Sequence, residues 1–395
     1  MIIYVTENLD HSYGGPSVTI PKYLEKYLAI NQKLRVLIDL KYGETCNNQS
    51  LCKIIPNKFI KCNSYNFLKL NIPYKVVYTF LTITKQHQVK ALHLNTIWKL
   101  GPYVLMLLAI IKNIPVVISP RGMLIQNAVK NKYVLKIILW NICYLPLIRS
   151  IKCFHASSDN EAIGIKKIAN KATVAIINHG IEPYKYINES IKTKSIKNLK
   201  LSEDYKYILF MARIVEHKGL HILINAYKKI SQSINNYKII VAGNFNDTGY
   251  EQYIKSLIVK YKIKDRVIFI GHVSENDKND AFSAATLFVL PTKSESFGAV
   301  IGEAISYGLP VITTCTTPWS EISKTKVGVL IDRDANDFAI KINYYCKLHK
   351  DKINEMQPLF KDIASRYSWD VSANKMDQVY SWCSGKSKKP KFVLN

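Results

Sequence analysis

The chain has 395 residues, 48% of them hydrophobic, and carries a formal net charge of +26 at pH 7. This length allows two or three domains with their own cores, and the longest apolar run, Tyr103 to Ile111, is too short to cross a bilayer. The eight cysteines lack a C-x-x-C pair, which argues against a zinc site or a disulfide framework and fits a reducing cytoplasm. We therefore expect a protein that is soluble or at most peripheral.

Strand and helix patterns alternate along the first half of the chain, which predicts a parallel sheet with crossover helices. This first domain is expected to cover residues 1–181. Its predicted strands are Ile2–Thr6, Leu34–Asp39, Ala91–Leu94, Val116–Ser119, Cys153–Ala156 and Thr173–Ile177. Its predicted helices are Pro16–Ile30, Asn66–Gln88, Leu100–Lys112 and Val129–Leu147.

The first half is also strongly cationic, because no Asp or Glu occurs between Glu44 and Asp159 while fifteen Lys and Arg residues do. Basic residues near an anionic membrane each contribute about 1 kcal/mol to binding. Asn66–Gln88 and Tyr133–Ile148 combine apolar bulk, aromatic residues and basic flanks, as interfacial helices do. For Tyr133–Ile148 we favour a core helix instead, since long apolar stripes are usually buried. The cationic surface itself we assign to an anionic membrane.

Residues 182–204 are polar, rich in Lys and Ser and without periodicity, so they predict a linker. A second domain is expected over 205–366. Its predicted strands are Tyr207–Ala212, Lys238–Ala242, Val267–Ile270, Leu287–Leu290, Val311–Thr314 and Val327–Ile331. A last helix is expected over 367–383, followed by a frayed tail over 384–395.

The turn between the strand Thr286–Leu290 and a short helix that ends at Gly308 predicts an anion site. The backbone N–H groups of Phe297, Gly298 and Ala299 would lie at the helix N-terminus, where unpaired donors and the helix dipole favour a phosphate. Glu295 and Glu303 flank this turn and would accept hydrogen bonds from the hydroxyls of a nucleotide-sugar. A single Glu is usually a solvated surface residue, but this spacing around a strand-to-helix turn favours a site.

A second strand-to-helix turn follows Tyr207–Ala212 and carries Arg213 and Lys218. Arg suits bidentate contact with phosphate, and Lys acts as a point charge. Both would stabilise the charge that grows on a departing nucleoside diphosphate. The alternative is a solvated helix start with an Arg–Glu surface pair.

These motifs together resemble those of the retaining glycosyltransferases of the GT-B fold, family 4. The resemblance rests on ARIVEHKGL from Ala212, VAGN at 241–244, GHV at 271–273 and LPTKSESFGAVIGEAISYGLPVITT from Leu290. In the first half it rests on Gly14-Gly15-Pro16, SPRGML at 119–124 and ASSDNE at 156–161. Thr317-Pro318-Trp319 and Tyr367-Ser368-Trp369 resemble a branch of the family that acts in the assembly of bacterial surface polysaccharides.

The resemblance implies an α/β fold of two doubly wound, Rossmann-like domains that face a central cleft, with a C-terminal helix crossing back. The first domain would bind the acceptor and the second the nucleotide-sugar, a UDP- or GDP-sugar. The backbone at Val273 would contact the nucleobase. Glycines at Gly14 and Gly15 would let backbone N–H groups approach the diphosphate, although an ordinary tight turn is the alternative for this pair alone.

The reaction implied is transfer of a sugar to a lipid-linked oligosaccharide or related glycan with retention of anomeric configuration, in O-antigen, capsule or lipopolysaccharide biosynthesis. Arg213, Lys218, Glu295 and Arg121 would be the catalytic residues, and Glu303 would bind the ribose. Arg213 and Lys218 make a divalent ion unnecessary for charge neutralisation, so neither a metal nor a cofactor is expected. The enzyme would be cytoplasmic and peripheral on the inner face of the cell membrane.

Arg121 departs from the family pattern, which often has a His there, and an always-charged Arg cannot be a general base. We predict that it contacts a phosphate or sugar oxygen. His93 and His155 also end strands, and a structural interpretation is favoured for both. Other functions left open are a GT-B enzyme with a soluble acceptor, a sugar-nucleotide epimerase and, least favoured, a nucleic-acid-binding protein with steeply salt-dependent binding. No nucleic acid is expected as a partner, because no binding motif accompanies the charge.

Overall fold

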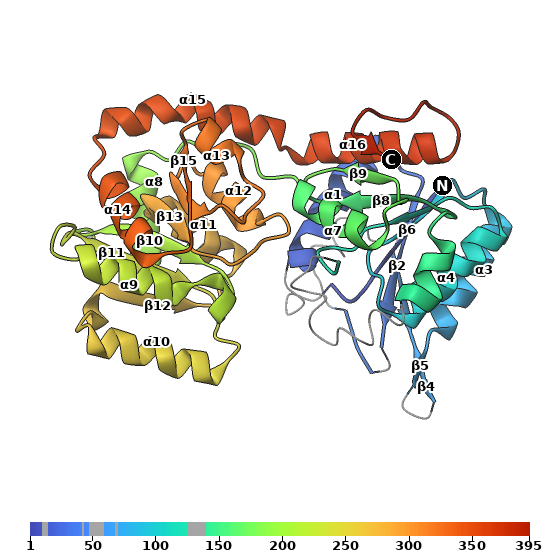
Figure 1. Cartoon of the computed structure of the whole chain (residues 1–395), viewed down its shortest axis with the longest axis horizontal. Helices are drawn as coiled ribbons and strands as arrows, with labels where there is room; N and C mark the ends of the chain where they lie inside the picture. Colours follow the sequence, from blue (N-terminus) through green and yellow to red (C-terminus); the bar gives the residue numbers. More distant parts are fainter. Residues whose placement is uncertain (10–14, 42, 47–58, 68–69, 125–139) are drawn as a thin grey trace. The chain divides into compact units, whose positions relative to one another are not determined.

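The computed structural model describes residues 1–395 except 10–14, 42, 47–58, 68–69 and 125–139. The chain divides into two compact units (Figure 1). The N-terminal unit consists of Met1–Gly180 and Trp369–Asn395, and the C-terminal unit is Ile181–Ser368. The last helix therefore belongs to the N-terminal unit, as the predicted crossing back requires.

The described residues of the N-terminal unit form an eight-stranded sheet in the order β16-β9-β8-β7-β6-β1-β2-β3. Neighbouring strands are parallel except β16, which pairs antiparallel with β9. The strands are β1 Ile2–Thr6, β2 Leu34–Leu40, β3 Phe59–Asn63, β6 Ala91–Leu94, β7 Val116–Ile118, β8 Ile151–Ala156, β9 Val174–Ile176 and β16 Val393–Leu394. A separate hairpin consists of β4 Tyr65–Phe67 and β5 Leu70–Ile72.

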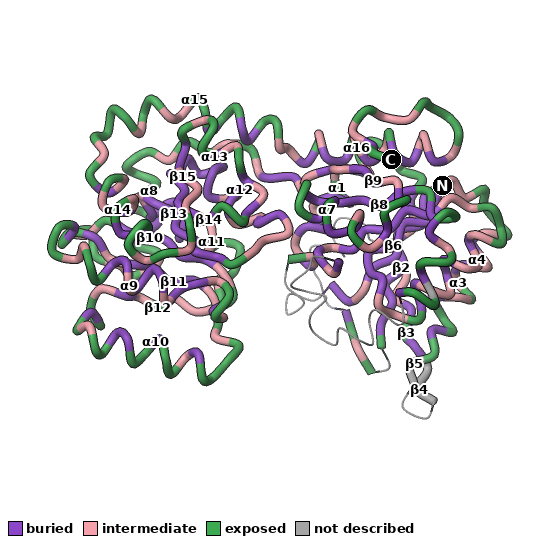
Figure 2. Tube along the Cα trace, in the orientation of Figure 1, coloured by how far each residue is buried: buried purple, intermediate pink, exposed green. Residues whose placement is uncertain are grey.

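Both faces of this sheet are buried, because helices pack against each of the two sets of side chains that alternate along a strand. Ile2 and Tyr4 of β1 belong to the cluster that includes residues of α1 and α16, whereas Ile3 and Val5 belong to the cluster with α3 and α4. Figure 2 shows the buried strands at the centre of the unit. The helices are α1 Gly15–Ile30, α3 Tyr74–Gln86, α4 Leu100–Ile111, α7 Asp159–Ile168 and α16 Trp369–Cys383.

The C-terminal unit contains a six-stranded parallel sheet in the order β12-β11-β10-β13-β14-β15. Its strands are β10 Lys206–Met211, β11 Tyr237–Ala242, β12 Val267–Gly271, β13 Leu287–Leu290, β14 Val311–Thr314 and β15 Gly328–Ile331. Its helices are α8 Glu189–Asn198, α9 Leu220–Ile230, α10 Thr248–Lys260, α11 Glu275–Ala284, α12 Ala299–Ser306, α13 Glu321–Lys324, α14 Ala335–Cys346 and α15 Lys350–Arg366. The prediction of two doubly wound α/β domains is thereby confirmed.

The predicted helix Asn66–Gln88 is wrong in its first part. Helix α3 begins only at Tyr74, after the β4–β5 hairpin, and Pro73 is its N-cap residue. A proline lacks the N–H that a continuous helix from residue 66 would need at this point, and its ring disfavours helical geometry in the preceding residue. The edge strand β3 was not predicted.

Two segments of low apolar content are more ordered than their composition indicates. The expected linker 182–204 contains α8, where the Asn188 side chain accepts from the Ile191 N–H, and Ser195 and Asn198 donate to Asp280 of α11. The tail, expected to be frayed, ends in β16. There Val393 is buried and pairs with Ala175.

Most of the predicted helix Val129–Leu147 lies outside the described residues. In the described part, Trp140, Tyr144 and Ile148 are buried, which supports the core interpretation of Tyr133–Ile148, whereas Ile142 is 70% exposed. The part of the chain that the structure describes contains no helix with the length and apolarity to span a membrane.

Candidate active site

The turn between β13 and α12 leaves several backbone donors unpaired. Gly298, the N-cap residue of α12, has φ 76° and ψ 58°, a left-handed conformation that favours glycine. A Cβ there would lie 3.1 Å from Ile301 Cδ1 and 3.3 Å from Glu295 Cγ. Among the described residues, none accepts a hydrogen bond from the N–H of Gly298, Ala299 or Val300. The first turn of α12 therefore presents free donors and the positive end of the helix dipole.

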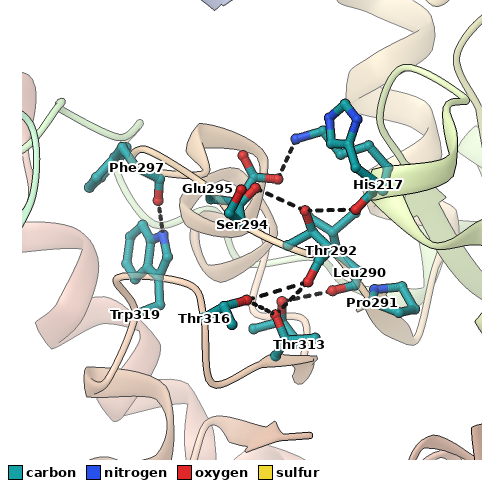
Figure 3. Close-up of polar contacts among 12 residues, drawn as sticks. His217, Leu290, Pro291, Thr292, Ser294, Glu295, Phe297, Thr313, Thr316 and Trp319 are labelled. Atoms are coloured by element: carbon teal, nitrogen blue, oxygen red, sulfur yellow. Dashed lines mark hydrogen bonds and ion pairs between the residues drawn. The ribbon is translucent and has the colours of Figure 1, made fainter. Parts of the chain in front are cut away.

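Trp319 fixes the orientation of this turn. Its indole N–H donates to the Phe297 carbonyl at 2.6 Å (Figure 3), its side chain is fully buried, and the two rings are 5.0 Å apart. Because a trans peptide holds its C=O and N–H in opposite directions, the N–H of Gly298 points away from Trp319. The sequence predicts no role for Trp319 beyond its place in the motif Thr317-Pro318-Trp319.

Lys218 and Glu295 meet at the carboxyl edge of the sheet. Lys218 ends the 3-10 turn Glu216–Lys218 after β10, and its Nζ lies 2.6 Å from Glu295 Oε1. The side chains are 14% and 12% exposed. Gly219 allows this approach, since it has φ 81° and a Cβ there would lie 2.1 Å from the Pro291 carbonyl oxygen. A cation and a carboxylate from two separate turns are thus adjacent.

Hydrogen bonds connect the turn after β10 to the loop after β13. The His217 carbonyl accepts from the Lys293 N–H at 2.7 Å, and the hydroxyl of Thr292 also points to it (Figure 3). The hydroxyl of Thr314, the last residue of β14, donates to the Thr292 carbonyl at 2.7 Å. The loop that carries Glu295 is therefore held from two sides.

Arg333 is a further connection that the sequence did not reveal. Its Nε donates to the Pro291 carbonyl at 3.0 Å and its Nη2 to the Glu216 carbonyl at 2.9 Å. No local motif marks this residue, because its partners are backbone atoms of two distant loops.

Arg213 has an exposed side chain with no hydrogen bond or ion pair to any described residue. It contributes to a positive potential, since burial together with Lys218 and Arg213 lowers the pKa of His217. Lys218 thus forms an ion pair with Glu295, whereas the side chain of Arg213, on the same turn, is exposed to solvent.

Glu303 and Val273 lie on neighbouring elements of the same unit. Glu303 is in the second turn of α12, and its Oε1 accepts from Lys278 Nζ of α11 at 2.9 Å rather than from Lys218. Val273 follows β12, and its backbone N–H and C=O have no hydrogen-bond partner among the described residues. Val273 thus offers a free donor and a free acceptor for a planar polar group.

Arg121 belongs to the N-terminal unit and follows β7 in a left-handed conformation, with φ 53°. Its guanidinium donates to Asn95 Oδ1 at 2.9 and 3.1 Å and to the Tyr4 hydroxyl at 3.0 Å, and it lies 3.4 Å from the ring nitrogens of His179. Burial and this guanidinium hold the pKa of His179 well below its usual range. Arg121 is thus held in place by protein side chains.

The buried carboxylate of Glu161 supports the turn that carries Arg121. It accepts from the Gly122 N–H at 2.5 Å and from the N–H and hydroxyl of Ser157 at 2.7 and 2.6 Å. Glu161 is 1% exposed. Of the two glycines expected to approach a diphosphate, Gly15 is the first residue of α1, and Gly14 lies outside the described residues.

His93 and His155 form a buried chain of hydrogen bonds, in agreement with the structural interpretation. His155 Nε2 faces the Ile177 carbonyl at 2.8 Å, so it carries the proton and Nδ1 accepts from the Ser119 hydroxyl at 2.6 Å. That hydroxyl then accepts from His93 Nε2 at 2.6 Å, which leaves His93 Nδ1 to accept from Tyr380 of α16 at 2.5 Å. One backbone carbonyl thus determines both tautomers.

Both rings are neutral. Burial, with His155 and Arg121 nearby, holds the pKa of His93 well below its usual range. Burial and the Arg121 guanidinium lower the pKa of His155 to about 3.

The chain is similar to known proteins in both sequence and structure. Residues 191–357, most of the C-terminal unit, match the family described as Glycosyl transferases group 1. An uncharacterized glycosyltransferase of Methanocaldococcus jannaschii is 28% identical over 52% of this chain and 53% of its own length. The lipopolysaccharide core biosynthesis mannosyltransferase LpsB of Rhizobium meliloti is 27% identical over 40% of this chain and 46% of its own. The chain spans about half the length of these relatives.

Solved structures match nearly the whole chain. The Anabaena protein HepE in complex with UDP has a TM-score of 0.76 at 18% identity, covering 96% of this chain and 99% of that protein. WaaG, a glycosyltransferase involved in lipopolysaccharide biosynthesis, has a TM-score of 0.69 at 15% identity over 96% and 100%. These likenesses confirm the GT-B fold.

Proposed function

We propose that this protein is a retaining glycosyltransferase of family 4 that transfers a sugar from a nucleoside-diphosphate-sugar to a lipid-linked oligosaccharide or related glycan. The match of residues 191–357 to the group 1 glycosyl transferases supports the reaction class. A lipopolysaccharide mannosyltransferase among the relatives supports an acceptor in O-antigen, capsule or lipopolysaccharide biosynthesis. HepE, solved with UDP, supports a nucleotide donor.

The observation that carries the proposal is the convergence of Lys218, Glu295 and the free N–H groups of Gly298 and Ala299. They lie after β10 and β13, adjacent strands of a parallel sheet, and ligands of such sheets bind outside the carboxyl ends of the strands. A diphosphate needs cations and N–H donors, and a sugar needs carboxylate acceptors. The site contains both kinds of group.

Each residue then has an expected role in binding. Lys218, Arg213 and the N–H groups at 297–299 bind the diphosphate, and Glu295 binds sugar hydroxyls. Glu303 binds the ribose, and the backbone of Val273 contacts the nucleobase. In the N-terminal unit, Arg121 contacts a phosphate or sugar oxygen.

The reaction is a front-face displacement. The bond between the anomeric carbon and the donor phosphate oxygen breaks, and the acceptor oxygen bonds to the same face of that carbon. The acceptor proton passes to the departing phosphate, so the protein supplies no general base. Lys218 and Arg213 stabilise the growing negative charge, and preorganised groups of this kind supply much of the rate enhancement in enzymes. No metal is required in this scheme.

The cationic N-terminal unit is proposed to bind the inner face of the cell membrane. On α3, Tyr74 and Tyr78 are 67% and 60% exposed with stacked rings 6.1 Å apart, beside exposed Lys75 and Lys85. Exposed aromatic and basic residues are typical of interfacial helices. Cosedimentation with vesicles of anionic lipid, against vesicles of neutral lipid, tests this part of the proposal. Equal binding to both kinds of vesicle would contradict it.

Calorimetric titration with UDP, GDP and their sugars tests the donor site. Lys218→Ala and Glu303→Ala are each expected to lose most transfer activity while remaining folded, whereas Lys255→Ala, on the exposed face of α10, retains it. Turnover of both site variants at the parental rate would refute the assignment.

The acceptor is tested by comparing the donor alone with the donor plus a membrane extract. Product formed only with the extract supports a lipid-linked acceptor. Product formed without it would instead identify a soluble-acceptor enzyme or a sugar-nucleotide epimerase.

A further inference from the structure

Lys278 of α11 lies between two carboxylates, one on its own helix and one on α12. Its Nζ is 2.9 Å from Glu303 Oε1 on α12 and 3.1 Å from Glu275 Oε2, one turn earlier on α11. The side chains of Lys278 and Glu303 are 15% and 18% exposed, whereas Glu275 is 60% exposed. The inner pair is therefore shielded from solvent, and the outer carboxylate is not.

Two carboxylates face one ammonium in this group. Burial lowers the pKa of Lys278, but Glu303 and Glu275 together raise it above its ordinary value, so the ammonium stays charged. A charged ammonium held against Glu303 Oε1 restrains the orientation of that side chain.

The ion pair uses only one oxygen of Glu303. Among the described residues, none donates a hydrogen bond to Oε2, so this oxygen is available as an acceptor. Glu303 is five residues after Gly298, which places it about 7 Å along α12 from the free N–H groups. One helix therefore presents donors at its start and an anchored carboxylate farther along.

We propose that Lys278 is a positioning residue for the donor nucleotide: it fixes the orientation of Glu303, so that the carboxylate accepts hydrogen bonds from the ribose 2′- and 3′-hydroxyls. The inference rests on the proposed function, in which Glu303 binds the ribose. It adds that selection of ribose over deoxyribose depends on a lysine that does not contact the nucleotide. If Lys278 only connected α11 to α12, its loss would change stability and not this selection.

The experiment compares the dissociation constants of UDP and 2′-deoxy-UDP by calorimetry, with the GDP pair in parallel. Lys278→Met is expected to weaken binding of the ribonucleotide about tenfold. Without Lys278, Glu303 is no longer held in place, and the hydrogen bond between its carboxylate and the ribose is lost. Lys278→Met should also lower the ribose preference to that of Glu303→Gln. The double variant Lys278→Met with Glu303→Gln should bind like Glu303→Gln alone, because the two substitutions remove the same interaction with the ribose. Lys255→Met, which removes an exposed ion pair on α10, is the matched control and should bind like the parent.

Thermal unfolding of each variant accompanies the titrations. If Lys278→Met does not fold, Lys278→Gln replaces it, since a side chain of similar length without charge should show the same loss. Lys278→Arg, which keeps the charge, should recover part of the ribose preference.

The two hypotheses fail in different ways. If the parent binds neither UDP nor GDP, the proposed function fails. If the parent and Lys278→Met prefer ribose equally while Glu303→Gln does not, the positioning role is refuted and the proposed function stands. A parent without any ribose preference also refutes the role.

Discussion

The buried chain of His93, Ser119 and His155 predicts that acid destabilises the N-terminal unit selectively. In the unfolded chain the pKa of His155 is near 6.5, and in the folded unit it is about 3. Folding lowers the pKa of His155, so the folded unit favours the neutral imidazole. The contribution of the neutral His155 to the free energy of unfolding is fully present above pH 6.5 and is lost as the pH falls toward 3.

The magnitude follows from linkage. Between pH 7.5 and pH 5 the unfolded state gains nearly one proton at His155 while the folded state gains almost none, which costs about 2 kcal/mol of the free energy of unfolding. His93, whose pKa is also well below its usual range, adds a loss of the same sign. The four histidines of the C-terminal unit are exposed or half-buried, so that unit should change less.

Hydrogen exchange measured by mass spectrometry resolves the two units in one sample. Peptides that cover the strands β6, β7 and β8 themselves should lose about 2 kcal/mol or more of protection between pH 7.5 and pH 5, after correction for the intrinsic exchange rate. Peptides from β10 to β14 are the internal control. His155→Gln, which lacks a titratable ring, should show a pH dependence smaller by about 2 kcal/mol. Equal losses in both units, or an unchanged slope in this variant, would contradict neutral buried imidazoles.

Three further predictions concern the C-terminal unit. Trp319→Phe leaves the buried Phe297 carbonyl without its donor and should lower the free energy of unfolding by about 1 to 3 kcal/mol, measured by urea denaturation; a loss below 0.5 kcal/mol would mean that this bond is unimportant. Gly298→Ala forces a side chain into φ 76° and should cost about 1 to 2 kcal/mol and weaken UDP binding, whereas Gly385→Ala, at φ 75° in open space, is the control for strain alone. Transfer activity should survive EDTA, because cations of the chain neutralise the diphosphate; loss of activity that Mg²⁺ or Mn²⁺ restores would overturn this.

The sequence predicted the strands of both sheets well, and for a physical reason. Leu287–Leu290 is a short, continuous apolar run, and Val311–Thr314 consists entirely of β-branched residues; buried parallel strands favour both compositions. The prediction failed where order depends on distant partners. Helix α8 is stabilised in part through Asp280, and β16 pairs with β9, and neither partner is visible in the local sequence.

The same division holds for the candidate site. The sequence predicts the spacing of Glu295, Gly298 and Glu303 around a strand-to-helix turn, because the turn between β13 and α12 is a local structure. It does not predict the partners of these groups. Lys218 reaches Glu295 across 77 residues, and Lys278 reaches Glu303 across 25.

The sequence by itself therefore determined most of the buried parallel strands, the α/β class and the side chains available for chemistry, since these follow from periodicity and residue type. Only the tertiary structure decided which of those side chains are paired, anchored or free. That choice depends on which strands are neighbours in the sheet, and strand order is set by the packing of the whole unit.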